Sequence, residues 1–262
     1  MREMKSVLVA YSGGVDSSYL ALIAAGELGD NAVCMMGISP SVSAFQRVEA
    51  ANIAEAFHFK FETVDTLELD DPSYAANPSN RCYFCKSELF GRLSSMAIAR
   101  NISYVVDGTN ADDLRDHRPG RVAAAELQVR SPLAETGFTK SDIRERSRFY
   151  KLPTWDRPAS PCLSSRIAYG IPVTLERLGR VERGEEYLRN EGFREFRVRD
   201  HGDLARIEIA RPEMDRIMSA AAGAALAGQF KSFGFKYVTL DLAGFRSGSM
   251  NETVLTDKLE NQ

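Results

Sequence analysis

Three of the four cysteines stand where a thiol could carry chemistry: Cys82, Cys85 and Cys162. Cys82 and Cys85 are three residues apart at the start of a helix that we expect from about Asn80, so both sulfur atoms lie on one helix face. The helix dipole and the neighbouring basic residues favour thiolates, the form that acts as a nucleophile or a metal ligand. Cys34 falls within an expected buried strand, where a thiol is inert.

The three thiols have several possible uses. Two cysteines cannot complete a tetrahedral metal site, and the sequence has no second C-x-x-C motif and no H-x-x-x-H motif to finish a structural zinc site. Three cysteines can hold three irons of a 4Fe–4S cluster and leave the fourth iron open to another ligand, such as sulfide. Zinc binding by all three thiols, a regulatory disulfide and buried, inert thiols are the alternatives.

A glycine-rich segment, S-G-G-V-D-S at residues 12–17, lies between an expected strand and an expected helix. Its glycines let the backbone approach an anion, and the helix start supplies free N–H groups and the positive end of a dipole. The segment is neither a Walker A loop nor a G-x-G-x-x-G loop. It predicts a phosphate site, and the alternative is a turn that only links strand to helix.

The first part of the chain alternates expected strands with helices. Short apolar, β-rich runs predict strands at residues 6–11, 31–38, 59–64 and 103–107, with helices at 42–57 and from about residue 80. This order predicts an α/β fold with a doubly wound parallel sheet, which binds its ligands at the carboxyl ends of the strands.

A proline-rich loop after Trp155 indicates a domain boundary, which we place between residues 165 and 166. The first domain, 1–165, then contains the phosphate loop and most of the cysteine site, and the second, 166–262, is a smaller α+β domain. In the second domain we expect a charged helix, two strands, a further helix from Pro212 and a last strand. The charged helix is expected at residues 175–190, the two strands at 193–199 and 204–210, and the last strand at 237–242.

Composition and charge restrict the function classes. The 262 residues are 44% hydrophobic and 26% charged, as in ordinary folded proteins. A net charge of −3 argues against a protein that coats nucleic acid or anionic lipid. The chain has no run of about 18 apolar residues and no secretory pattern at its start. We therefore expect a cytoplasmic protein with no nucleic-acid or membrane partner.

The S-G-G-x-D-S pattern resembles the pyrophosphate loop (PP-loop) of ATP pyrophosphatases, whose fold is adenine nucleotide α-hydrolase-like. The resemblance implies Mg²⁺ and ATP, which is split into AMP and pyrophosphate as a substrate oxygen is adenylated. Either Asp112 or Asp113 could help to hold Mg²⁺, and capping of a helix is the alternative for both. A core role is the alternative for Met36. By this resemblance the nucleotide-binding residues are Ala10, Ser12, Gly13, Gly14, Asp16, Ser17, Met36, Gly108, Thr109 and Asp112.

Further motifs sharpen the resemblance. They are S-P-L at 131–133, T-K-S-D-I-R at 139–144, L-P-T-W at 152–155 and C-L-S-S-R at 162–166. Together with the phosphate loop they resemble the ATP-dependent sacrificial sulfur transferases of nickel-pincer nucleotide cofactor biosynthesis (the LarE family). The resemblance implies that carboxylates of pyridinium-3,5-biscarboxylic acid mononucleotide become thiocarboxylates and that Cys162 donates sulfur. The additional Cys82 and Cys85 are typical of relatives that use a 4Fe–4S cluster carrying an extra sulfide, and we favour that route.

Charged residues of the second domain predict a substrate site. Arg197 and Arg199 share one face of an expected strand and could clamp a phosphate or a carboxylate. A solvated charged face is the alternative. By the family resemblance, the residues that bind substrate or line the site between subunits of a homo-oligomer are Arg197, Arg199, Glu185, Glu208, Asp215 and Arg246. Glu186 matches as well as Glu185.

The sequence thus predicts an ATP-dependent sulfur transferase whose nucleophile comes from Cys162, Cys82 and Cys85. A tRNA-thiolating enzyme with the same loop is one alternative, but the net charge offers no basic RNA surface. An amide-forming synthetase is another, and it leaves the three cysteines without a role. A nucleotide-sensing module that does not turn over ATP is the third.

Overall fold

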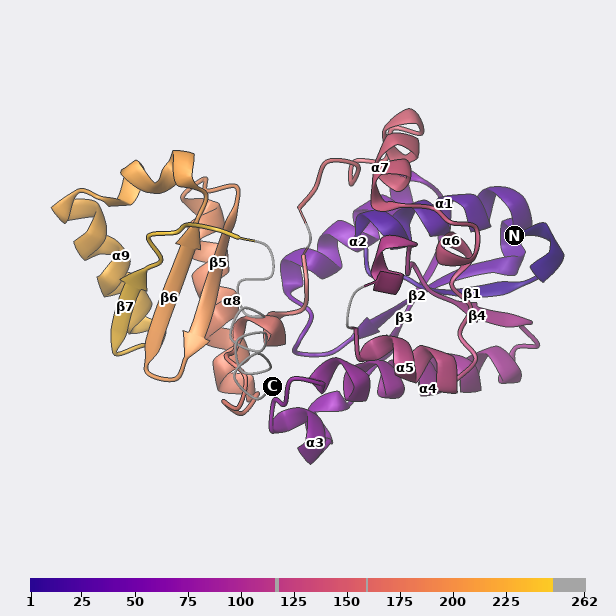
Figure 1. The fold of residues 1–262 in the computed structure, drawn as a ribbon, viewed down its shortest axis with the longest axis horizontal. Coiled ribbons are helices and arrows are strands. Elements are labelled where there is room, and N and C mark those ends of the chain that lie inside the picture. The colour runs from indigo at the N-terminus through magenta and orange to yellow at the C-terminus, as the bar shows by residue number, and fades with distance from the viewer. Residues whose placement is uncertain (116–117, 159, 247–262) are drawn as a thin grey trace. The chain divides into compact units, whose positions relative to one another are not determined.

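The computed structural model describes residues 1–115, 118–158 and 160–246. The described chain forms two compact units (Figure 1). The first unit comprises Met1–Tyr74 and Asn80–Ser160, and the second comprises Ala75–Ser79 and the described residues from Pro161 onward. The segment Ala75–Ser79 therefore packs with a part of the chain that lies far from it in the sequence.

The first unit is built on a parallel sheet of four strands in the order β3-β2-β1-β4. The strands are β1 (Val7–Ala10), β2 (Ala32–Ile38), β3 (Lys60–Asp65) and β4 (Tyr104–Val106). Because β1 neighbours both β2 and β4, the strand order reverses direction at β1, as in a doubly wound fold. The predicted α/β fold class is confirmed.

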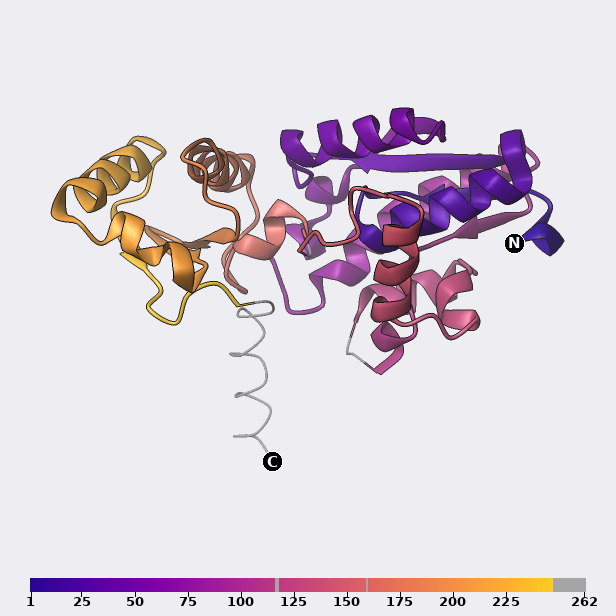
Figure 2. The same ribbon diagram turned by 90° about the horizontal axis from the view of Figure 1, so that it is seen from above.

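Helices cover both faces of this sheet (Figures 1 and 2). Helices α1 and α2 lie on one face, and α4 and α5 lie on the other. The helices of this part of the chain are α1 (Val15–Leu28), α2 (Ala44–Ala56), α3 (Pro72–Ala75), α4 (Arg81–Ala99), α5 (Gly120–Glu126), α6 (Pro132–Glu135) and α7 (Lys140–Phe149). Within the described residues, no helix has both the length and the apolar character needed to cross a membrane.

Alternating side chains explain the two covered faces. In β1, Val7 and Val9 belong to the core beneath α1 and α2, whereas Leu8 belongs to the core beneath α4. In β2, Cys34 and Met36 contribute to the first core. Successive side chains of a strand point to opposite faces, so a continuous apolar run fills both cores. This leaves the strand ends and their loops to carry polar chemistry.

The second unit pairs three strands in the order β5-β6-β7. Its elements are α8 (Leu175–Asn190), β5 (Phe196–His201), β6 (Leu204–Ile209), α9 (Ala220–Ser232) and β7 (Tyr237–Leu240). Strands β5 and β6 are antiparallel, and β6 and β7 are parallel. The pairing sets Arg197 opposite Glu208 and Arg199 opposite Arg206. The helix predicted at 175–190 is confirmed over that range.

The helix expected from Pro212 is wrong in its extent. Residues Arg211–Ile217 form a 3-10 helix, η6, and α9 begins only at Ala220. The Ser219 side chain accepts a hydrogen bond from the backbone N–H of Ala222 and so starts a new helix there. Met214 and Ile217 pack against the core of the second unit, but Met218 is 61% exposed, so the apolar spacing that suggested one continuous helix does not mark a single buried face. The other 3-10 helices are η1 (Arg2–Met4), η2 (Gly29–Asn31), η3 (Glu68–Asp70), η4 (Asp112–Arg115) and η5 (Leu163–Arg166).

The segment Ala75–Ser79 is fixed to the second unit through Asn77. This side chain is fully buried, and its amide nitrogen lies 3.3, 2.8 and 2.8 Å from the carbonyl oxygens of Ile167, Ala168 and Ile171. The backbone N–H of Val173 donates to the carbonyl of Ala75. These bonds satisfy buried backbone acceptors that would otherwise destabilise the fold.

Candidate functional site

The glycine-rich loop connects β1 to α1, as predicted. Gly14 is the residue before the first turn of α1. The Ser17 hydroxyl lies 3.1 Å from the Ser12 hydroxyl, accepts from the Ser12 backbone N–H at 3.2 Å and donates to the Gly14 carbonyl at 3.2 Å. These bonds hold the loop in one shape around the start of the helix. This helix end is where the sequence predicts an anion site, because the first N–H groups of a helix have no partners within the helix.

Gly13 is the one loop position at which both the backbone and the space require glycine. Its φ is +73°, and an added Cβ would lie 2.7 Å from Cβ of Ala50 on α2. We expect Gly13→Ala to lower the free energy of unfolding by about 1–3 kcal/mol, because the side chain is both strained and overpacked.

Urea unfolding of the purified variant measures this change, with Gly14→Ala as the matched control. Gly14 has an ordinary φ of −76°, and a Cβ there would approach only the Ser12 hydroxyl, at 3.5 Å. Equal midpoints for the two variants would show that the close approach to α2 does not matter.

A second loop, at the carboxyl end of β4, packs directly against the first. A Cβ added to Gly108 would lie 2.9 Å from the backbone nitrogen of Ser17. The Asp107 carboxylate shapes this loop: it accepts from the Thr109 backbone N–H at 3.2 Å, from the Thr109 hydroxyl at 2.7 Å and from the Ser131 hydroxyl at 2.7 Å. The loops after β1 and β4 thus meet at one edge of the sheet.

Lys140 joins the two loops, and the sequence reasoning did not single it out. Its Nζ atom lies 2.5 Å from Oδ2 of Asp16, and its backbone N–H donates to Oδ2 of Asp112 at 2.8 Å. Lys140 opens α7, where Thr139 and Asp142 form a capping box. The T-K-S-D motif was the available signal, because a capping box places the lysine in the first turn.

The acidic residues near these loops differ in their burial and in their hydrogen-bond and ion-pair partners. Asp113 is buried, lies 2.8 Å from the Arg118 guanidinium and accepts from the backbone N–H of Asn110 at 3.1 Å. Asp112 is exposed. Oδ1 of Asp16 is buried and finds no hydrogen-bond partner among the described residues. An unpartnered carboxylate oxygen in this position fits a Mg²⁺ ligand.

Ala10 and Met36 lie at or near the carboxyl ends of their strands. Ala10 ends β1, and Met36 precedes the last two residues of β2. The Met36 side chain is only 2% exposed and packs in the core beneath α1 and α2. This position agrees with the core alternative for its side chain.

Cys82 and Cys85 lie in the first two turns of α4, Cys82 exposed and Cys85 half-buried. Asn80 precedes the helix, although its side chain makes no capping hydrogen bond. Cys162 immediately precedes η5 in the second unit. Among the described residues, no group of three or more His, Cys, Asp or Glu side chains is arranged around a metal position. Cys34 is fully buried, and burial raises the pKa of its thiol to about 12, which makes it inert.

In the second unit, ion pairs connect most of the predicted substrate residues. Nη2 of Arg199 lies 3.0 Å from Glu208, whose other oxygen lies 2.9 Å from Nη2 of Arg206. Asp241 continues the chain of charges, 3.8 Å from Arg206 and 3.7 Å from Arg246. Glu208 is fully buried, and each of its carboxylate oxygens accepts a hydrogen bond from the guanidinium of Arg199 or Arg206.

Arg197 lies beside this network. Burial, reinforced by the charge of Arg166, lowers the pKa of the Arg197 guanidinium to about 10. Its guanidinium carbon lies 4.9 Å from the centre of the Phe245 ring. Guanidiniums bind phosphates and carboxylates with well-defined geometry, which agrees with the prediction for Arg197. Asp215, in contrast, lies exposed in η6.

The structure separates Glu185 from its neighbour Glu186. Glu185 is buried and lies 2.9 Å from Nε of Arg166, whereas Glu186 is exposed. Although burial favours its neutral form, the Arg166 guanidinium holds the pKa of the Glu185 carboxyl below its usual value. Of the two glutamates, Glu185 is the one that joins the charged group in the second unit.

Several known proteins are similar to this chain over most of its length. No family model matches the chain. It is 46% identical over 252 residues to the uncharacterized protein slr1717 of Synechocystis sp., covering 96% of this chain and 94% of that protein. It is 34% identical over 260 residues to the pyridinium-3,5-bisthiocarboxylic acid mononucleotide synthase of Lactiplantibacillus plantarum, covering 99% and 94%. The chain belongs to this synthase family. The uncharacterized protein MJ0830 of Methanocaldococcus jannaschii is 31% identical, covering 93% and 92%.

The similarity to the synthase confirms the family that the motifs suggested. In this synthase-family chain, the polar residues described above form two groups. One group surrounds the loops after β1 and β4 in the first unit, and the other surrounds Cys162 and β5 in the second.

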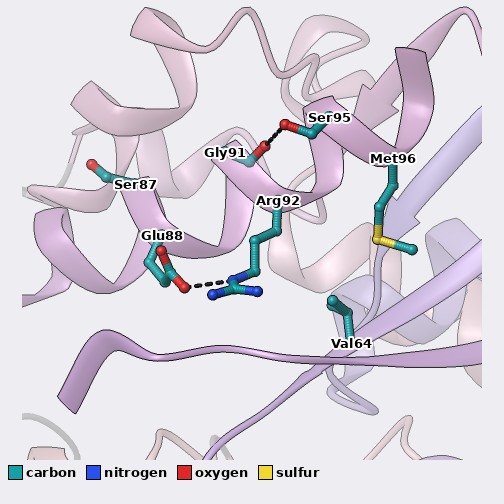
Figure 3. A pocket seen from close by; sticks show the side chains of 7 residues that line it. All are labelled: Val64, Ser87, Glu88, Gly91, Arg92, Ser95 and Met96. Carbon is teal, nitrogen blue, oxygen red and sulfur yellow. Dashed lines mark hydrogen bonds and ion pairs between the residues drawn. The ribbon is translucent and has the colours of Figure 1, made fainter. Parts of the chain in front are cut away.

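A separate hollow of about 530 Å³ lies between α4 and β3 (Figure 3). It is lined by Val64, Ser87, Glu88, Gly91, Arg92, Ser95 and Met96. None of these is a predicted site residue, and Glu88 and Arg92 form an ion pair along α4.

Proposed function

We propose that this chain is an ATP-dependent sulfur transferase that converts carboxylates of pyridinium-3,5-biscarboxylic acid mononucleotide into thiocarboxylates. The observation that carries the proposal is the full-length similarity to a synthase of the corresponding bisthiocarboxylic acid mononucleotide. That product differs from a biscarboxylic acid by sulfur in place of oxygen. Such an exchange requires the carboxylate oxygen to become a leaving group, and adenylation by ATP achieves this.

We assign adenylation to the loops of the first unit, as in PP-loop enzymes. A carboxylate oxygen attacks the α-phosphorus of ATP, and the bond to the β-phosphate oxygen breaks to release pyrophosphate. The N–H groups at the start of α1 and the Nζ atom of Lys140 stabilise the charge on the departing pyrophosphate. Asp16, with its unpartnered oxygen, and Asp112 would hold Mg²⁺, which neutralises further phosphate charge.

We assign the anionic groups of the substrate to the second unit. Arg197 and Arg199 are partly or fully buried on β5 and are directed by Glu208 and neighbouring charges. Paired guanidiniums bind phosphate and carboxylate oxygens with well-defined geometry. Arg246 and Asp215 are the further substrate residues of this proposal. A second copy of the chain is the proposed partner.

Delivery of sulfur is assigned to Cys162 together with Cys82 and Cys85. Three thiols fit the donor set of a 4Fe–4S cluster with one open iron, and two of them lie in one helical turn, where side chains three apart are about 5–6 Å from each other. When bound, such a cluster supplies a sulfide. The displaced group at the carboxyl carbon is AMP, so the new C–S bond replaces the C–O bond of the adenylate.

The function is tested by mixing the purified protein with Mg-ATP and pyridinium-3,5-biscarboxylic acid mononucleotide. Pyrophosphate release that depends on this substrate, with a mass increase of the product for each oxygen replaced by sulfur, supports the proposal. Release that depends instead on tRNA or on ammonia assigns the chain to a thiolating or an amide-forming enzyme. ATP binding with no release under any condition indicates a binding module.

Cys82→Ala tests the cluster. We expect the anaerobically purified protein to contain about four irons per chain with matching sulfide, and the variant to lose them, because one of three ligands is gone. Iron and sulfide analysis, absorption and EPR spectroscopy measure this. An iron-free protein that transfers sulfur once and loses the mass of H₂S at Cys162 would contradict the cluster.

A further inference from the structure

We propose that Arg166 is a positioning residue for the Cys162 thiol, because its guanidinium clamps the peptide groups on both sides of the Cys162 Cα atom. This inference rests on the proposed function, in which Cys162 delivers sulfur. It concerns contacts made entirely within the second unit. Sulfur transfer requires the reacting sulfur to stand in one direction, and the backbone of its residue sets that direction.

The clamp consists of hydrogen bonds from one nitrogen. Nη1 of Arg166 donates to the carbonyl oxygen of Pro161 and, at 3.1 Å, to the carbonyl oxygen of Cys162. These two carbonyls belong to the peptide planes that precede and follow the Cys162 Cα atom. Fixing both planes fixes φ and ψ of Cys162, so the direction of the Cα–Cβ bond is set. Rotation about χ1 is then the only remaining freedom of the sulfur atom.

Ser165 strengthens the same clamp. The Cys162 carbonyl also accepts from the Ser165 backbone N–H at 3.0 Å and from the Ser165 hydroxyl at 2.7 Å. The carbonyl of Ser165 in turn accepts from Nη1 of Arg199 at 3.2 Å. The segment that follows Cys162 is therefore tied to Arg166 and to one of the proposed substrate arginines.

Glu185 orients the clamp from the other side. Its Oε1 and Oε2 atoms accept from Nε and Nη2 of Arg166 at 2.9 and 3.2 Å, and Oε1 also lies 3.4 Å from the Val198 backbone nitrogen. The two side chains are only 3% and 8% exposed. A buried ion pair contributes little net stability, because desolvation offsets the attraction. A bidentate pair does fix the plane of the guanidinium, which is what the clamp needs.

This arrangement gives Glu185 the role of holding Arg166, in place of direct contact with the substrate. It also predicts that lysine cannot replace arginine at this position. Arg166 uses Nε and Nη2 for Glu185 and Nη1 for the carbonyls, whereas lysine has a single nitrogen. Arg166→Lys therefore keeps the charge beside Glu185 but loses the fork that reaches both partners.

The test compares Arg166→Lys with Arg180→Lys. Arg180 is a matched control, because it is also buried and makes the same kinds of contact. It forms a bidentate pair with Asp200 and donates to the backbone carbonyl of Gly202. We expect Arg166→Lys to lower kcat for sulfur transfer about 10- to 100-fold with the KM for ATP unchanged. Hydrogen–deuterium exchange of a peptide spanning residues 161–167 should become about 10-fold faster or more. Neither change is expected in Arg180→Lys.

Two results would overturn the inference: a wild-type kcat in Arg166→Lys, or the same loss of kcat in Arg180→Lys. If Arg166→Lys does not fold, Glu185→Gln takes its place, with a smaller effect in the same direction. Hydrogen exchange needs no turnover. A wild-type protein without sulfur transfer would therefore reject the proposed function, and unchanged exchange in the variant would separately reject the clamp.

Discussion

Replacing Cys162 by alanine is expected to abolish sulfur transfer while substrate-dependent pyrophosphate release continues. Adenylation is assigned to the loops of the first unit, which Cys162 does not belong to, so ATP chemistry should survive. Loss of the group that delivers the nucleophile removes the second step, and such losses reduce rates on the order of 10³-fold or more. Parallel assays of pyrophosphate and of thiocarboxylate product, the latter by mass spectrometry, separate the two steps.

Cys34→Ala is the matched control for this prediction. Its thiol is fully buried in β2 and has a raised pKa, so it takes no part in transfer. The control variant should form thiocarboxylate at the wild-type rate. Thiocarboxylate formed by Cys162→Ala at a comparable rate would show that sulfur reaches the substrate by another path.

Replacing Lys140 by alanine should have an effect of similar size on the first step. Its Nζ atom, 2.5 Å from Asp16, stands beside the loop that we assign to pyrophosphate. Removal of one charge-stabilising group from such a site costs about 10²–10³-fold in kcat. We expect that loss in pyrophosphate release, measured with saturating ATP and substrate.

The comparison for Lys140→Ala is Lys60→Ala, which removes an exposed lysine from the edge strand β3. Unfolding curves of both variants show whether the fold survives. We expect it to survive in Lys140→Ala, because the hydrogen bond to Asp112 comes from the backbone N–H of residue 140, which alanine retains. Normal pyrophosphate release by a folded Lys140→Ala protein would remove this lysine from the adenylation site.

Local patterns were sufficient to predict much of the fold. The apolar run at 7–10 and the glycines after it define both a buried strand and the turn into α1. The bounds of α8 agree because Thr174 caps its first turn and a glycine follows soon after its last residue. In such places local backbone preference and burial point to the same structure.

Contacts between distant residues could not be predicted in this way. Lys140 and Asp16 are 124 positions apart, and no periodicity connects them. The choice of Glu185 over Glu186 depends on which side of α8 faces Arg166, and this is fixed only when the helix packs against β5. The prediction of a single helix from Pro212 did not take account of Ser219. Its side chain caps a new helix at Ala220, and such a side-chain hydrogen bond to the backbone competes with continuation of the preceding helix.

The bonds of Asn77 have a consequence for the order in which the chain can fold during synthesis. Its three carbonyl acceptors belong to residues 167, 168 and 171, which leave the ribosome about 90 residues later. At synthesis rates of about 5–20 residues per second, the segment 75–79 waits several seconds for its partners. Because the first unit extends to Ser160, almost all of it has been synthesised before the segment 75–79 meets these partners.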